Sequence, residues 1–249
     1  MAALLNLSIS PQNKSRIVQA GVIPEIINVM NSGSLKACED GATILLTLSY
    51  LSDDVKFLIG SHEGLRPLVY LLREGSERGQ KEAVAALFNL CLLPCNIKRA
   101  VEVGVVSEII WLMGQWYYPV RDEALALLNA IVNHHDVLRA LEREPLIYYL
   151  KEFFSRGSRK NQEDAASVLL QLFSINPRYV EEARELGVGW WLLEVQQYGS
   201  DEGKRKASDL LANIATYVGN RTGIKRPRID HTCEASTSRS KPRPRGGTD

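Results

Sequence analysis

The chain has 249 residues, of which 45% are hydrophobic and 24% are charged, and its formal net charge is +1 at pH 7. This composition favours a globular protein with a large core. The four cysteines are too few to form a disulfide framework, which favours a reducing compartment, the cytoplasm or the nucleus. The opening stretch MAALLNLSIS lacks the basic start of a secretory signal. No window reaches the roughly 18 apolar residues of a membrane span, so we expect neither export nor membrane insertion.

The charge is distributed unevenly along the chain. Residues 219–249 contain eight basic and three acidic side chains, a net of +5, which leaves −4 for residues 1–218. The tail is rich in Pro, Ser, Thr and Gly and has few apolar residues, so it cannot offset the entropy cost of ordering. We predict a domain over 1–218 and a disordered basic tail over 219–249. Lys225, Arg226 and Arg228 are candidates for a nuclear-import signal, and the tail is the one segment expected to contact nucleic acid; a solvated tail without function stays an open alternative.

A block of similar sequence recurs six times, which predicts a repeat architecture. The copies are AALLNLS from Ala2, GATILLTLS, EAVAALFNL, DEALALLNA, DAASVLLQL and KASDLLANI. One polar residue near the end of each copy, called here the marker, aligns them at intervals of 41, 42, 40, 42 and 42 residues: Asn6, Thr47, Asn89, Asn129, Gln171 and Asn213. The chain therefore divides into a partial repeat over 1–10 and five repeats over 11–52, 53–93, 94–133, 134–175 and 176–218.

Each full repeat is predicted to contain three helices. The first helix is short and ends near a glycine, such as Gly21, Gly64, Gly104 or Gly187, because glycine accepts the left-handed conformation of a helix end. The second has an apolar stripe, as in Ile23, Ile26, Ile27 and Met30. The third contains the aligned block. Since one repeat cannot bury its own apolar face, the repeats must stack into an all-α, right-handed superhelical solenoid.

The period near 42, the glycine between the first two helices and the third helix ending in Asn-Leu resemble the armadillo repeat. The stretches NKSRIVQAGVIPEIINVMNSGS, REGSERGQKEAVAALFNLC and YGSDEGKRKASDLL are similar to the C-terminal armadillo region of plant U-box E3 ubiquitin ligases, and the resemblance covers residues 1–218. It implies that the repeats capture the protein to be modified, whereas a U-box would recruit the conjugating enzyme. No residues before the first marker could form a U-box, so the resemblance reaches substrate binding and stops short of catalysis.

Residue patterns predict no catalytic site, no metal site and no cofactor. Cys91 and Cys95 have a spacing that could place two thiolates on one helix face, but Pro94 interrupts the helix between them. His134 and His135 are adjacent, so on a helix their side chains point about 100° apart and do not share a metal easily. A small-molecule substrate is therefore not expected.

The resemblance implies that the third helices line a concave groove, which makes the six markers candidate partner-binding residues. Their amides and hydroxyls suit the backbone of an extended peptide, although each marker could instead bond local backbone groups. Importin-like grooves have tryptophan four residues before each asparagine; no tryptophan stands there in this chain, which argues against a nuclear-import receptor. The groove candidates also include Lys81 and Arg121, each eight residues before its marker, and Asn133. We expect a bound protein segment with apolar anchors, and acidic groups near Lys81 and Arg121.

Two further features stay open. Trp116 and Tyr117 interrupt the usual polar turn and could anchor a partner or fold back on their own repeat. The opening MAALLNLSIS corresponds to the second half of a groove-lining helix, so we expect either a longer gene product or a partner covering this end. The predicted function is a protein-interaction module of the ubiquitination pathway whose partners include ubiquitination substrates. A noncatalytic armadillo scaffold in signalling, with a nuclear location, is the alternative.

Overall fold

The structure, a computed structural model, describes residues 1–115 and 119–222 of the chain. Within these ranges it has sixteen helices and no strand. The helices, in chain order, are α1 (Ala2–Ile9), α2 (Pro11–Gln19), α3 (Ile23–Ser32), α4 (Leu35–Ser49), α5 (Asp53–Ser61), α6 (Leu65–Glu74), α7 (Glu77–Cys91), α8 (Pro94–Glu102), α9 (Val105–Gly114), α10 (Arg121–Ile131), α11 (His135–Leu141), α12 (Leu146–Arg156), α13 (Arg159–Ile175), α14 (Pro177–Glu185), α15 (Val188–Tyr198) and α16 (Asp201–Thr222).

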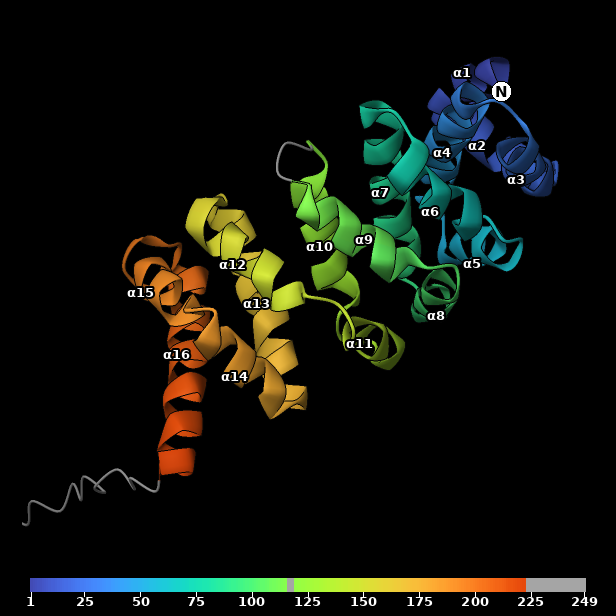
Figure 1. Ribbon diagram of the computed structural model, residues 1–249. Helices are drawn as coiled ribbons and strands as arrows, with labels where there is room; N and C mark the ends of the chain where they lie inside the picture. Colours follow the sequence, from blue (N-terminus) through green and yellow to red (C-terminus); the bar gives the residue numbers. More distant parts are fainter. Residues whose placement is uncertain (116–118, 223–249) are drawn as a thin grey trace, which may run out of the picture.

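The helices form three-helix units stacked along a curved rod (Figure 1). Helix α1 is the third helix of the partial repeat, and the third helices of the following repeats are α4, α7, α10, α13 and α16. Successive third helices, from α1 to α16, pack against each other, so they form one continuous row. The predicted all-α, right-handed armadillo solenoid is confirmed.

The turns between first and second helices follow the sequence signals with one exception. Gly21, Gly104 and Gly187 have φ angles of 68°, 91° and 69°, the left-handed region in which a β-carbon is disfavoured. The expectation of the same conformation at Gly64 is wrong. The left-handed residue of that turn is Glu63, with φ 61°, and Gly64 has φ −64°. Gly64 instead allows close packing, since a β-carbon there would lie 2.8 Å from the Ile59 side chain.

Four of the five full repeats start their third helix with a Gly-Ser pair. Ser34, Ser76, Ser158 and Ser200 each accept a hydrogen bond from the backbone N–H three residues later, at 3.1 to 3.3 Å. Such a bond satisfies one of the free N–H groups of a helix start. Helix α10 differs, because its first flanking residue, Val120, offers no side-chain cap. It begins later in its repeat and has 11 residues, whereas α4 and α7 have 15.

The core runs through the whole row of repeats. Buried leucines and isoleucines of the third helices meet apolar residues of the second helices, such as Leu68, Leu72 and Ile109, all 0% exposed. Helix α16 continues to Thr222, four residues beyond the predicted end of the domain at 218. Continuing an existing helix adds one hydrogen bond for each residue fixed, and residues 219–222 include no proline to stop it. The tail predicted over 219–249 otherwise lies outside the described residues.

Candidate partner-binding groove

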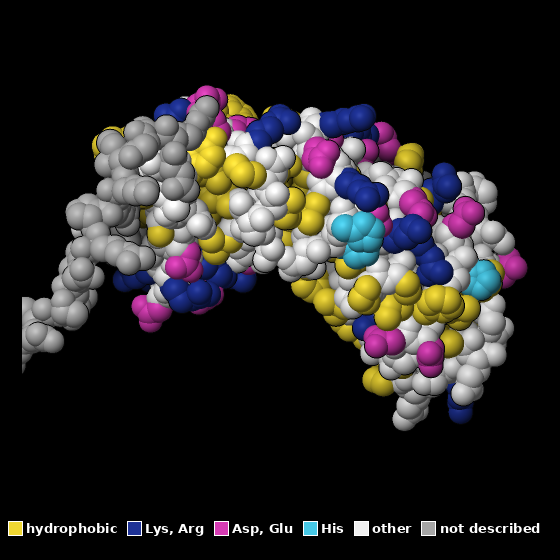
Figure 2. Space-filling view, turned by 90° about the horizontal axis from the view of Figure 1, so that it is seen from below, with side chains coloured by type: hydrophobic (Ala, Val, Ile, Leu, Met, Phe, Trp, Pro, Cys, Tyr) yellow, Lys and Arg dark blue, Asp and Glu magenta, His cyan; other side chains and the backbone are white. Residues whose placement is uncertain are grey.

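The row of third helices is the surface that the armadillo resemblance assigns to a concave groove. Figure 2 shows the molecule as an arch with a hollow on one side, and hydrophobic side chains gather along the inner edge of its right-hand arm.

The markers differ in how open they are to a partner. Asn6 and Asn213 are exposed, whereas Thr47 and Gln171 are half-buried. Asn89 is 6% exposed, and its Nδ2 donates a hydrogen bond to Ser49 Oγ of α4 at 2.6 Å. The amide of Asn89 therefore links two neighbouring third helices. Its low exposure leaves little of this amide open to a peptide.

Asn129 makes a second link of this kind. Its Nδ2 donates to Asp164 Oδ1 of α13 at 2.9 Å, and its side chain is half-buried. Asp164 also accepts from Lys160 Nζ at 2.9 Å. The two amides at the centre of the row thus hold repeats together. Asn133 is exposed but lies beyond the end of α10.

The burial pattern of α10 shows that the marker of its repeat is Ala130 and not Asn129. In α4, α7 and α13 the residues two before and one after the marker are leucines with 0% exposure. In α10 the corresponding fully buried residues are Leu128 and Ile131, and Ala130 is exposed between them. The marker spacing then becomes 41, 42, 41, 41 and 42.

Hydrogen bonds support the corrected register. Gln80 and Gln162, nine residues before their markers, donate from Nε2 to the carbonyls of Leu72 and Phe154 at 3.0 and 3.1 Å. Arg121 Nε makes the same bond to the Met113 carbonyl at 2.8 Å. Arg121 is therefore equivalent to these glutamines and not to Lys81, as the aligned sequence had indicated. Polar identity misled the alignment, because an alanine occupies the true marker position.

The two cations predicted to receive acidic groups already have partners. Lys81 Nζ lies 2.7 Å from Glu77 Oε1, and this hydrogen bond, with the charges of Glu77 and Glu123, raises the pKa of Lys81. The guanidinium of Arg121 lies 4.1 Å from the centre of the Phe153 ring, and burial lowers the pKa of Arg121. The position of Lys81 in the repeat is occupied in α10 by Asp122, which is exposed.

Two glutamates at the same repeat position as Lys81 stabilise the start of the next third helix. Glu39 Oε1 accepts from the Ser76 backbone N–H at 3.0 Å, and the Glu163 carboxylate accepts from the Ser200 hydroxyl. Carboxylates at helix N-termini also interact favourably with the helix dipole. We call the charged residues near the starts of the third helices the charged margin; most of the side chains described above are engaged within the chain.

Apolar side chains are exposed near the C-terminal ends of α4 and α7. Tyr50 is 66% exposed, Leu51 37%, Phe88 39% and Leu92 56%. We call these four residues the apolar strip. Leu51 stands one turn after its marker, so its register alone is enough to place it at the edge of the groove. Phe88 and Tyr50 were missed, although the apolar identity of positions one before and three after the marker could have shown them.

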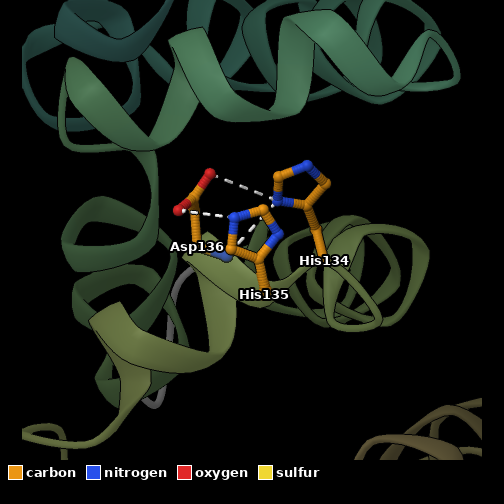
Figure 3. Close-up of side chains that lie close together, drawn as sticks. All are labelled: His134, His135 and Asp136. Carbon is orange, nitrogen blue, oxygen red and sulfur yellow. Dashed lines mark hydrogen bonds and ion pairs between the residues drawn. The ribbon is translucent and has the colours of Figure 1, made fainter.

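His134, His135 and Asp136 lie together at the start of α11 (Figure 3). The two imidazole rings stack at 4.7 Å between centres, and His135 Nε2 lies 3.1 Å from Asp136 Oδ1. The expectation that adjacent histidines diverge is wrong, because His134 precedes the helix in an extended conformation with ψ 131°. His134 Nδ1 accepts from the Asp136 N–H at 3.3 Å, so the arrangement caps the helix start.

The cysteines of the described residues do not form a metal site or a disulfide. Cys38 and Cys91 are buried, and burial raises the pKa of Cys38 to about 11 and the pKa of Cys91 to about 12. Both are therefore neutral thiols at physiological pH. Cys95 is exposed and lies in the first turn of α8. Trp116, Tyr117, Lys225, Arg226 and Arg228, predicted as aromatic anchors and as a nuclear-import signal, lie outside the described residues.

Across residues 1–115 and 119–222, no helix combines the length and the low polarity that crossing a membrane requires.

Comparisons with known proteins agree with this architecture. Residues 52–92, the second full repeat, match the Armadillo/beta-catenin-like repeat family. A designed armadillo repeat protein in complex with the peptide (KR)4 superposes with a TM-score of 0.72 at 20% identity over 86% of this chain and 92% of that one. A computationally designed armadillo repeat protein for modular peptide recognition gives 0.74 at 19% identity over 85% and 90%. The chain is thus an armadillo solenoid.

Among natural proteins, the chain is similar to U-box domain-containing proteins of Arabidopsis thaliana. It is 38% identical to U-box domain-containing protein 12 over 218 residues, which cover 87% of this chain and 33% of that protein. It is 27% identical to U-box domain-containing protein 16 over 226 residues, 89% of this chain and 33% of that protein. The chain spans about a third of the length of these relatives. This similarity extends over most of the chain, as the resemblance had implied.

Proposed function

We propose that the chain binds an extended protein segment along its third helices and thereby selects substrates for ubiquitin transfer by a U-box ligase. The observation that carries the proposal is the apolar strip on α4 and α7, four exposed apolar side chains on the surface that the fold assigns to a groove. Exposed apolar patches often mark protein-interaction sites. The similarity to U-box proteins over nearly nine-tenths of the chain supports the ubiquitination pathway as its setting.

The role of the chain in this proposal is recognition. Ubiquitin transfer by a U-box needs the conjugating enzyme and a substrate held within its reach, and the repeats supply the second requirement. Holding a substrate raises its effective concentration at the conjugating enzyme by the same mechanism as any tethered pair of binding sites. Binding strength and geometry at the groove then decide which proteins are modified.

A reconstituted ubiquitination reaction tests the proposal. Proteins that bind the full chain are first identified by affinity purification, with a Phe88→Ser, Leu92→Ser variant as the matched control. A chimera of a U-box and the full chain is then assayed with activating enzyme, conjugating enzyme, ubiquitin and the purified partner. We expect modification of the partner by the chimera and a loss of at least tenfold with the groove variant. A partner that binds the groove and is never modified would favour the noncatalytic scaffold.

A further inference from the structure

We propose that the N-terminal half of the groove, over α4, α7 and the start of α10, takes an extended protein segment that presents apolar side chains and, three or four residues away, a basic one. The inference rests on the proposed function and specifies the chemistry of its partner. It reverses the sign of the charge that the sequence had predicted for that partner.

The apolar strip defines where the apolar side chains bind. Tyr50 and Leu92 occupy the same position, three residues after the marker, in successive third helices that pack against each other. Packed helices lie about 8–10 Å apart, and an extended chain advances about 3.3 Å per residue. A partner with apolar residues two or three positions apart can therefore contact the exposed side chains of both helices.

The charged groups of α7 do not call for an acidic partner. Lys81, Phe88 and Leu92 share one face of the helix, because their spacing follows the helical repeat. Lys81 is paired with Glu77, and the charge of Glu123 also acts on it. Within the first two turns, Glu77 and Glu82 balance Arg78 and Lys81. This part of the margin is close to neutral.

The start of α10 adds negative charge to that margin. Asp122 and Glu123 are both exposed in the first turn, where the helix dipole favours the ionised carboxylate. Arg121, the basic residue beside them, is half-buried and donates to the Met113 carbonyl of α9. The two carboxylates therefore face the solvent, and the charge of Glu123 acts on Lys81. Lys81 lies about 10 Å along the axis of α7 from Phe88, at 1.5 Å per residue. A basic side chain of the partner, three or four residues from its apolar anchors, reaches the two carboxylates.

The test uses the full chain and a random dodecapeptide library displayed on phage, followed by a fluorescein-labelled synthetic peptide of the most enriched sequence. We expect enriched peptides to combine two or more Leu, Ile, Phe or Tyr residues with Lys or Arg. In fluorescence polarisation, Phe88→Ser with Leu92→Ser should weaken binding at least tenfold. Asp122→Lys with Glu123→Lys should weaken it about fivefold at low salt and less at high salt, as expected for exposed charges. The matched control is Tyr70→Ser on α6, an exposed aromatic on a second helix, which should change affinity less than twofold.

The outcomes separate the inference from the function beneath it. Acidic peptides weakened by Lys81→Glu would overturn the inference and leave groove binding intact. So would binding of a synthetic peptide of residues 223–249 as tight as that of the selected peptide, since the occupant would then be the chain's own basic segment. A dimer in sedimentation that the Phe88→Ser, Leu92→Ser variant dissociates would assign the strip to a second copy. Peptide binding that no third-helix variant weakens would refute the proposed function itself. Circular dichroism confirms that each variant is folded before it is scored.

Discussion

Replacing Arg121 distinguishes a structural residue from a residue that contacts a partner. In the structure its guanidinium donates to the Met113 carbonyl at the end of α9 and lies over the Phe153 ring. A hydrogen bond from a charged group contributes about 1.5–3 kcal/mol to stability. We expect Arg121→Ala to lower the free energy of unfolding by about 2 kcal/mol, which corresponds to about 4–8 °C in Tm for a chain of this size.

Arg121→Gln is the matched control, because Gln80 and Gln162 make the equivalent bond in two other repeats. It should retain most of the stability, within about 1 kcal/mol of the parent chain. Urea denaturation followed by circular dichroism measures both variants, and equal m-values would show that the midpoints can be compared. An Ala variant as stable as the parent, or a Gln variant as unstable as Ala, would refute the corrected register of α10.

Three further predictions concern local structure. Glu39→Ala removes the acceptor for the Ser76 N–H at the start of α7 and should lower stability by about 1 kcal/mol in the same urea assay, whereas an unchanged midpoint would argue against this link. In Gly104→Ala the added β-carbon meets no neighbouring atom, but the backbone has φ 91°, so the variant should lower the free energy of unfolding by about 1 kcal/mol. Gly189→Ala, in α15 with equally open space, should raise it by up to about 1 kcal/mol. Thermal melts that show the same sign for both variants would contradict the backbone argument. In a Cys233→Ser background, a thiol reagent at pH 8 should modify Cys95 in the folded chain. The same reagent should modify Cys91, whose pKa is raised to about 12 by burial, only after the chain has been unfolded.

The fold could be predicted from the sequence because periodicity repeats the same signal many times. A single apolar stripe such as that of α3 fits many all-α folds, but six aligned blocks at a spacing of about 42 fit few. Helix ends were also predictable where one residue type decides them, as at Gly104 and Gly187. Gly64 shows the limit: a glycine in the expected place served close packing, and its neighbour Glu63 took the left-handed conformation.

The groove was less predictable because side-chain partners come from other repeats. Nothing within the block around Asn89 shows that its amide bonds Ser49, 40 residues earlier. Likewise, the charge of Arg121 suggests a solvent-facing cation, whereas the structure directs it to the end of α9. Pairing of this kind depends on how successive repeats stack, and it changed the predicted charge of the partner.

The central claim is that the third helices, and not the second helices, bind the partner. Hydrogen–deuterium exchange of the full chain, with and without the selected peptide, tests this claim most directly. Bound peptide should slow exchange in α4, α7 and the first turn of α10, because contacts there suppress local opening, and should leave α6 and α12 unchanged. Protection concentrated in α6, α9 and α12, with none in α4 and α7, would contradict the account.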